Sequence, residues 1–210
     1  MGDVYLPHFN RMDEADVPEF LDSIATAELV TVGADGYPVA TLMPFLRDGD
    51  RLLMHMARGN PHWQAIEPGT PALAIVAGNQ AYVSPAWYAT KRDHGRVVPT
   101  WNYTAVHLTG VVTAHHDEAW LRDVVERLTD RHEAGRPDPW SIDDAPADYI
   151  AKQLRAIVGI ELTVERVEAK AKLSQNRSDD DRAGVVSGLE AEGAERDVRV
   201  AADMRRTERT

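Results

Sequence analysis

The feature that most constrains the fold is a series of short apolar, β-branched runs separated by tight-turn signals. The runs L-V-T-V (29–32), V-A-T-L-M (39–43) and L-L-M-H-M (52–56) are joined by Asp35-Gly36 and by Asp48-Gly49-Asp50. Asp-Gly pairs are typical of the turns that connect antiparallel strands. The first part of the chain is therefore predicted to be an antiparallel meander.

Later segments extend this pattern and add helices. Strands are predicted over 72–76, 81–83, 101–112 and 160–167, and helices from Asp16 and over 61–67, 117–133 and 149–157. Six or seven antiparallel strands with helices inserted late predict an α+β, mainly β fold, a small antiparallel β-barrel with peripheral helices. We expect residues 1–177 to form this domain. The polar segment 178–210 is expected to be a helical or partly flexible tail associated with a dimer.

Composition excludes several classes of protein. The 210 residues include no cysteine, which excludes disulfides, thiolate metal sites and a cysteine nucleophile, and fits a reducing compartment. There is no 18-residue apolar run and no signal-peptide pattern, so a cytoplasmic protein without a membrane span is expected. The net charge of −11 argues against DNA binding, because DNA affinity comes mostly from neutralising phosphates.

Aromatic residues are concentrated in the middle of the chain, where six of them fall within the 41 residues 63–103. They are accompanied by polar residues such as His55, Asn60 and Asn102. One interpretation is ordinary core and strand packing. The other is a wall for a flat conjugated ligand whose rim atoms meet amide and hydroxyl groups.

Two polar segments could bind the charged parts of such a ligand. Arg58-Gly59-Asn60-Pro61 lies between a predicted strand and a predicted helix, where an arginine and backbone N–H groups suit a phosphate. The alternative is a turn with a solvated arginine. K-L-S-Q-N-R (172–177) carries two cations and three polar side chains after the last strand. It either meets a polar ligand edge or closes the end of the barrel.

Metal and hydrolase chemistry have little support. The eight histidines show no H-E-x-x-H motif and no i, i+4 pair, so no metal site is predicted. Ser84 is followed by proline rather than held in a G-x-S-x-G motif. His55 and His107 lie in predicted strands.

Five segments in order give the chain a resemblance to a known family. They are V-Y-L-P (4–7), H-M-A-R-G-N-P-H-W (55–63), A-Y-V-S-P-A-W-Y (81–88), V-P-T-W-N-Y-T-A-V-H (98–107) and K-L-S-Q-N-R (172–177). Together they resemble the PaiB family of FMN-binding split-barrel proteins, which carry the label of negative transcriptional regulators. The resemblance implies a homodimeric, Greek-key split β-barrel with FMN at the dimer interface. The resemblance also implies that the protein acts as a negative transcriptional regulator, directly or indirectly, or as a small flavin-dependent oxidoreductase.

On this basis we predict that Arg58 and Asn60 hold the phosphate of FMN. Thr41 to Met43 are expected on one side of the flavin ring, and Trp101, Asn102 and 172–177 near the other. A cation at the pyrimidine edge would stabilise the anionic reduced ring. The full predicted cofactor set is Thr41, Leu42, Met43, His55, Ala57, Arg58, Asn60, Trp101, Asn102, Lys172, Ser174, Gln175, Asn176 and Arg177.

One departure from the family leaves an alternative open. The family's second strand often reads A-T-H-L-P, and this chain has A-T-L-M-P (40–44), so Leu42 replaces a histidine. A branch of the same superfamily binds haem b and includes haem-degrading proteins and piperazate synthases, which form an N–N bond. In that alternative, His55 or His107 would be the axial ligand.

Overall fold

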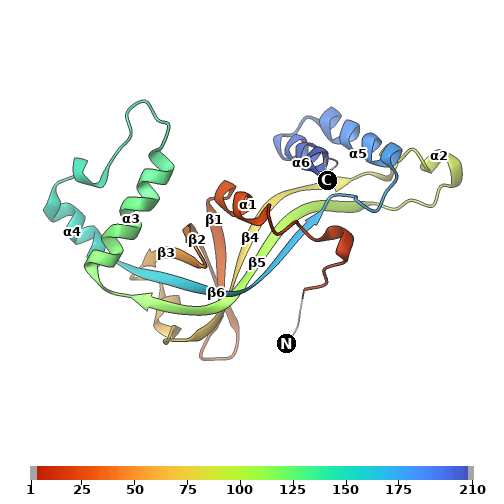
Figure 1. The fold of residues 1–210 in the computed structure, drawn as a ribbon. Coiled ribbons are helices and arrows are strands. Elements are labelled where there is room, and N and C mark those ends of the chain that lie inside the picture. The colour runs from red at the N-terminus through yellow and green to blue at the C-terminus, as the bar shows by residue number, and fades with distance from the viewer. Residues whose placement is uncertain (1–3, 208–210) are drawn as a thin grey trace. The chain divides into compact units, whose positions relative to one another are not determined.

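The computed structural model describes residues 4–207, and their strands form a closed antiparallel barrel in the order β1-β2-β3-β6-β5-β4 (Figure 1). The predicted fold class, a mainly β antiparallel barrel with peripheral helices, is confirmed. The strands are β1 (Thr26–Val32), β2 (Pro38–Asp48), β3 (Arg51–Ala57), β4 (Thr70–Val83), β5 (Thr100–His115) and β6 (Ile157–Lys172).

The helices are α1 (Val17–Ser23), α2 (Lys91–His94), α3 (Glu118–Glu133), α4 (Ala147–Arg155), α5 (Asp179–Glu192) and α6 (Glu195–Arg206). The described part of the chain also contains the 3-10 helices η1 (His8–Asn10), η2 (Pro61–Ala65), η3 (Pro85–Trp87) and η4 (Ile142–Asp144). Within residues 4–207, none of the helices has the length and apolarity needed to cross a membrane.

The structure differs from the predicted elements in three places. The two short strands expected over 72–76 and 81–83 are one continuous strand, β4. The helix expected over 149–157 ends at Arg155, because Ile157 pairs with Ala57 and so belongs to the β3–β6 ladder. The helix expected over 61–67 is the five-residue 3-10 helix η2.

Contacts divide the chain into two compact units. The barrel unit comprises Glu19–Val76 and His107–Val167, and the α5–α6 unit comprises Met1–Pro18, Ala77–Val106 and Glu168–Thr210. The domain division expected after residue 177 stays a prediction.

The core of the barrel unit follows from strand alternation. On β3, Leu52, Met54 and Met56 point into the barrel, opposite buried residues of β6, while Leu53 points outward. Val124 and Leu128 of α3 cover Leu53, so the apolar stripe predicted for this helix packs on the outside of the barrel.

Trp120 of α3 sets how closely that helix can approach β6. The backbone N–H of Trp120 donates to the carboxylate of Asp117, the residue that caps α3, at 2.8 Å. A Cβ atom on Gly159 would lie 2.1 Å from the Trp120 ring. The indole therefore occupies the space that any larger residue at position 159 would need. His115 stacks on the Trp120 ring, with ring centroids 4.2 Å apart.

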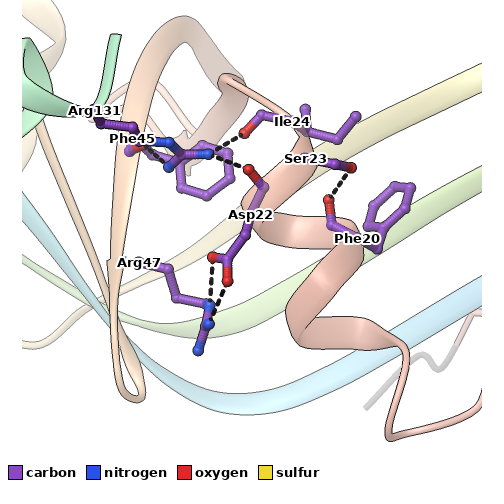
Figure 2. A network of polar contacts seen from close by, with 7 residues as sticks. All are labelled: Phe20, Asp22, Ser23, Ile24, Phe45, Arg47 and Arg131. Atoms are coloured by element: carbon purple, nitrogen blue, oxygen red, sulfur yellow. Dashed lines mark hydrogen bonds and ion pairs between the residues drawn. The ribbon is translucent and has the colours of Figure 1, made fainter. Parts of the chain in front are cut away.

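A polar network attaches α1 to the strand β2 and the helix α3 (Figure 2). The Arg131 guanidinium donates to the backbone carbonyls of Asp22 (2.6 Å), Ile24 (3.1 Å) and Phe45 (3.1 Å). The Asp22 carboxylate accepts two hydrogen bonds from Arg47, at 3.0 and 2.7 Å. These bonds hold the pKa of Asp22 below its usual value.

The α5–α6 unit has its own polar and close-packed contacts. Arg182, which is buried, donates to the backbone carbonyls of Leu173 (3.0 Å) and Met204 (2.9 Å), and so links the end of β6 to α6. A Cβ atom on Gly184 would lie 2.1 Å from the Trp87 carbonyl oxygen, and one on Gly188 would lie 2.3 Å from the Trp87 ring. The two glycines therefore let α5 pack directly on η3.

We expect Gly159→Ala to lower the free energy of unfolding by about 1–3 kcal/mol, because the added methyl group overlaps the Trp120 ring. Urea denaturation measures the effect. In the double variant Gly159→Ala, Trp120→Leu, the loss should be smaller than the sum of the two single losses.

Gly59→Ala is the matched control, because a Cβ atom on Gly59 meets nothing within 4 Å and its φ is not positive. Its stability should stay within about 0.5 kcal/mol of the unsubstituted protein. Equal effects of the two glycine substitutions would contradict the role assigned to Trp120.

Candidate functional site

Strand β2 has an edge that is only partly paired. Residues Pro38–Pro44 pair with β1, and within the described residues β2 pairs with β3 only from Phe45 to Asp48. The edge of 38–44 that faces β3 therefore lacks a strand partner in this part of the ladder. Such an edge presents backbone N–H and C=O groups that another group can bind.

The turn after β3 meets this edge through side chains. The Asn60 side-chain amide donates to Thr41 Oγ1 at 3.3 Å, and the Asn60 side-chain oxygen accepts from the backbone N–H of His62 at 3.0 Å. The backbone N–H of Asn60 also donates to the carbonyl of Ala57 at 2.9 Å. The predicted residues Thr41, Ala57 and Asn60, separated in sequence, are thus brought together at one place.

His62 is buried at the centre of this arrangement. Its Nε2 lies 2.9 Å from Thr31 Oγ1 and its Nδ1 lies 2.8 Å from Thr41 Oγ1. In a neutral imidazole one ring nitrogen donates and the other accepts, and two threonine hydroxyls can satisfy both. Burial lowers the pKa of His62, so the neutral form is favoured.

Arg58 is held by backbone carbonyls. Its Nε donates to the carbonyl of Arg155 at 2.8 Å and its Nη2 to that of Ile157 at 3.0 Å, where α4 ends and β6 begins. Its guanidinium carbon lies 5.9 Å from the centroid of the Trp63 ring, and Trp63 Nε1 donates to the Arg58 carbonyl at 2.8 Å. The positive charge of Arg58 therefore has a fixed position.

A pocket of about 280 Å³ lies beside Arg58. Two guanidinium groups and an imidazole lie in its wall with one carboxylate, so its charge suits an anion. The lining residues are Arg58, His116, Glu118, Leu121, Leu154 and Arg155.

The side chains of the three predicted β2 residues, Thr41, Leu42 and Met43, do not all point to the same face of the sheet. Thr41 and Met43 point inward, and Leu42 points outward with 63% of its surface exposed. A ligand on the outer face would therefore meet the Leu42 side chain and the backbone of its two neighbours.

The outer face of β1 and β2 carries a group of apolar side chains next to the exposed Glu28, which pairs with Leu42. It is formed by side chains that are exposed or half-buried at alternate positions, and we call it the β1–β2 outer face. Its members are Val30, Val32, Pro38, Ala40 and Leu42.

His55 is a second buried histidine in the barrel unit. It pairs with Gly159 across the β3–β6 ladder, which places it on the face that α3 covers. Its Nδ1 is buried without a hydrogen-bond partner among the described residues, and burial lowers its pKa. A buried polar atom without a partner is uncommon and needs an explanation. His107, the other candidate haem ligand, is half-buried on β5.

In the α5–α6 unit, several predicted residues bind one another. The buried amide of Asn102 donates to Ser174 Oγ at 3.0 Å, and Ser174 Oγ lies 3.1 Å from Asn102 Oδ1. The Gln175 amide donates to the carbonyl of Ala171 at 2.5 Å, and its oxygen accepts from the N–H of Leu173 at 2.8 Å. These bonds shape the turn after β6, where Ser174 has a φ of 64°. They favour the interpretation in which this segment closes the strand end.

The remaining predicted residues of this unit are more open. Lys172 Nζ donates to Thr100 Oγ1 at 2.7 Å and to the carbonyl of Trp101. Its pKa is lowered by burial and by the nearby charges of Lys170 and Arg177. The guanidinium carbon of Arg177 lies 4.8 Å from the centroid of the Tyr88 ring. Asn176 is exposed. Lys172 and Arg177 therefore supply the positive charge of this segment.

Sequence reasoning missed Thr31 and His62, which position Thr41 and Asn60. A partial signal existed, because Asn60 and Pro61 precede His62 as a cap precedes a helix. The His62 ring forms hydrogen bonds with two threonine hydroxyls, one on β1 and one on β2. The local sequence around His62 does not indicate this pairing.

Comparison with known proteins places these features in a wider group. Residues 4–166 match the family described as "Putative FMN-binding domain". Over 194 residues the chain is 31% identical to the "Protease synthase and sporulation protein PAI 2" of Bacillus subtilis (strain 168), covering 90% of each protein.

Two solved structures are similar in fold. The conserved hypothetical protein Rv2991 from Mycobacterium tuberculosis has a TM-score of 0.59 at 15% identity, over 82% of this chain and 92% of that one. The FAD and heme binding protein from Mycobacterium smegmatis has a TM-score of 0.58 at 24% identity, over 81% and 77%. At these identities the similarity shows the fold alone.

The buried histidines predict how stability depends on pH. Because the pKa of His62 is lowered in the folded state, the unfolded chain binds a proton first as pH falls below about 6.5. The contribution of the neutral histidine to the free energy of unfolding is therefore fully present above that pH. It decreases below that pH, by at most about 1.4 kcal/mol per pH unit for each such group. His55 contributes in the same direction.

Urea denaturation at about pH 7 and about pH 5, on either side of the histidine value, measures this loss. We expect His62→Gln to reduce the difference between the two pH values. His132→Gln, at an exposed position of α3, is the control and should leave it unchanged. An unaltered pH dependence in His62→Gln would contradict the assignment.

Proposed function

We propose that this chain, which belongs to the FMN-binding domain family whose model it matches, binds FMN as a homodimeric split-barrel flavoprotein of the cytoplasm. The observation that carries the proposal is the hydrogen bond between Asn60 and Thr41 at the open edge of β2. It joins the turn that bears Arg58 to a strand edge whose backbone groups lack a strand partner.

The residues fit an anionic, planar cofactor. Arg58 provides a positioned charge beside a pocket that suits a phosphate, and a guanidinium can bind phosphate through two parallel hydrogen bonds. The edge of β2 provides backbone donors and acceptors, and Leu42 provides an apolar surface. Bound FMN would supply redox chemistry, and these residues would bind and orient it.

The roles proposed for Trp101, Asn102, Lys172 and 174–177 at the flavin ring stay predictions. Lys172 and Arg177 support them through their charge. The internal bonds of Asn102, Ser174 and Gln175 support the alternative, a closed strand end.

A homodimer is proposed because of the β1–β2 outer face. Val32 and Leu42 are each 63% exposed there, and large exposed apolar side chains grouped on one surface mark interaction sites. The face is flanked by the open edge of β2, so a second copy seated on it would also border the proposed cofactor site. This agrees with the interface location that the family resemblance implies.

For the biological role we propose a small flavin-dependent oxidoreductase or a negative regulator that acts indirectly. With a net charge of −11, direct binding to DNA is the weaker possibility. Haem is a second candidate ligand, and the observation that favours it is the buried His55 Nδ1 without a partner. In that case His55 would have to become accessible.

The absorption spectrum distinguishes the two cofactors. We expect purified protein mixed with FMN to retain two broad flavin bands after filtration, and to show no Soret band after incubation with haem. We expect Arg58→Ala to weaken FMN binding about ten- to a hundredfold, through loss of a charged hydrogen-bond donor.

Arg122→Ala is the matched control, because Arg122 is a partly exposed arginine of the same unit. Since Arg58 also bonds two backbone carbonyls, unfolding midpoints are measured for each variant, and Arg58→Lys restores the charge alone. Affinity equal to that of the unsubstituted protein in Arg58→Ala would remove Arg58 from the site.

Sedimentation tests the dimer. We expect a species of twice the 23.3 kDa chain mass at micromolar concentration, and dissociation in Val32→Lys, because burying a lysine charge opposes association. Tyr149→Lys, at an exposed position of α4, is the control and should stay dimeric. A stable monomer of the unsubstituted protein would contradict the proposal.

A further inference from the structure

The α5–α6 unit contains a second pocket, of about 500 Å³, next to the start of α6. This volume lies within the range of about 300–1,000 Å³ that is usual for small-molecule sites. Of its lining, only Trp101 belongs to the predicted flavin set. The lining residues are Gly78, Asn79, Gln80, Trp101, Glu195, Arg196 and Arg199.

One wall of this pocket is aromatic. The Trp101 side chain is 48% exposed, and the ring of Tyr82 meets it edge to face, with centroids 6.3 Å apart and planes at 73°. This contact supports the indole and leaves part of its surface open. A planar ring can stack on such a surface.

The opposite wall is cationic. Arg196 and Arg199 are three residues apart on α6, so they lie on the same side of the helix. Their side chains are 72% and 62% exposed, and their ion-pair partners are Asp197 at 3.5 Å and Glu195 at 2.5 Å. The Arg199–Glu195 pair is exposed and contributes little to stability, so Arg199 can turn to a ligand at small cost. Arg196 contacts the buried Asp197 through Nε.

The charge of the lining selects the kind of anion. Two guanidinium groups and one carboxylate, that of Glu195, lie in the lining itself, and the carboxylate of Asp197 lies outside the lining, 3.5 Å from Arg196. This balance suits a monoanion rather than a polyphosphate. Guanidinium groups bind carboxylates through paired hydrogen bonds.

An amide group in the wall is fixed in position. The Asn79 amide donates to Asp203 Oδ2 at 2.8 Å, and Asp203 is buried and also accepts from Arg206. The pocket is therefore built from the end of β4 and from α6, which lie together in Figure 1. Its wall has a defined shape before any ligand binds.

We propose that this pocket binds a planar aromatic carboxylate, with the ring on Trp101 and the carboxylate on Arg196 and Arg199. The proposal rests on neither Arg58 nor the edge of β2, and Trp101 is the residue that it shares with the predicted flavin set. The ligand is a candidate substrate or effector of the protein.

Calorimetric titration of the protein as purified, with 4-hydroxybenzoate as the probe, tests the proposal. The neutral analogue 4-hydroxybenzamide and the non-aromatic acid hexanoate are titrated in parallel. We expect measurable binding of 4-hydroxybenzoate, at least tenfold weaker binding of both analogues, and a loss of about tenfold or more in Arg196→Gln, Arg199→Gln. Trp101→Leu should weaken binding to a similar degree.

Arg205→Gln is the matched control, because Arg205 is an exposed α6 arginine paired with Glu190 outside the pocket lining. It should bind the probe as the unsubstituted protein does. Equal binding of acid and amide, unchanged binding in the double arginine variant, or no binding of 4-hydroxybenzoate would each overturn the proposal. Because Trp101 also belongs to the predicted flavin set, the double arginine variant decides the result, and FMN retention, followed by absorbance, is a separate readout for each variant.

Discussion

The arrangement of the barrel unit around the candidate site depends on the placement of the His62 ring between two threonine hydroxyls. The ring bonds Thr31 on β1 and Thr41 on β2, and both bonds are shorter than 3 Å. A buried imidazole without partners would be costly, so the turn after β3 must lie where both hydroxyls can reach it. Asn60 follows from this, because it bonds both the Thr41 hydroxyl and the His62 backbone.

Arg58 forms hydrogen bonds that stabilise the fold, in addition to its proposed role in binding the ligand. Its guanidinium donates to the carbonyl of Arg155, at the end of α4, where a helix leaves its last carbonyls without partners, and to the carbonyl of Ile157, at the start of β6. A positive charge at a helix C-terminus is also electrostatically favourable. The same contacts that stabilise α4 hold the charge beside the pocket. A ligand phosphate would therefore bind a side chain that is already ordered.

The barrel unit thus combines a rigid turn with an apolar outer face on β1 and β2. Strand alternation explains both, since inward residues such as Thr41 serve the buried network while outward ones such as Leu42 remain exposed. The proposed cofactor and the proposed second copy would therefore use neighbouring but different atoms of the same strand.

Much of the fold follows from local sequence. The Asp-Gly turns and alternating runs led to the antiparallel barrel, and the apolar stripe of 117–133 led to α3, because turn chemistry and hydrophobic period are local properties. The continuity of β4 and the end of α4 at Arg155 were not predicted, since ladder partners distant in the chain determine both.

For the candidate site, sequence alone placed Arg58, Asn60 and Thr41 in one set through the family resemblance. Only the tertiary structure showed that Asn60 and Thr41 are bonded, that Met43 rather than Leu42 faces the core, and that Asn102 and Ser174 bind each other. The physical reason is that a hydrogen bond needs two groups within about 3 Å, and in this protein those groups come from segments that only folding brings together.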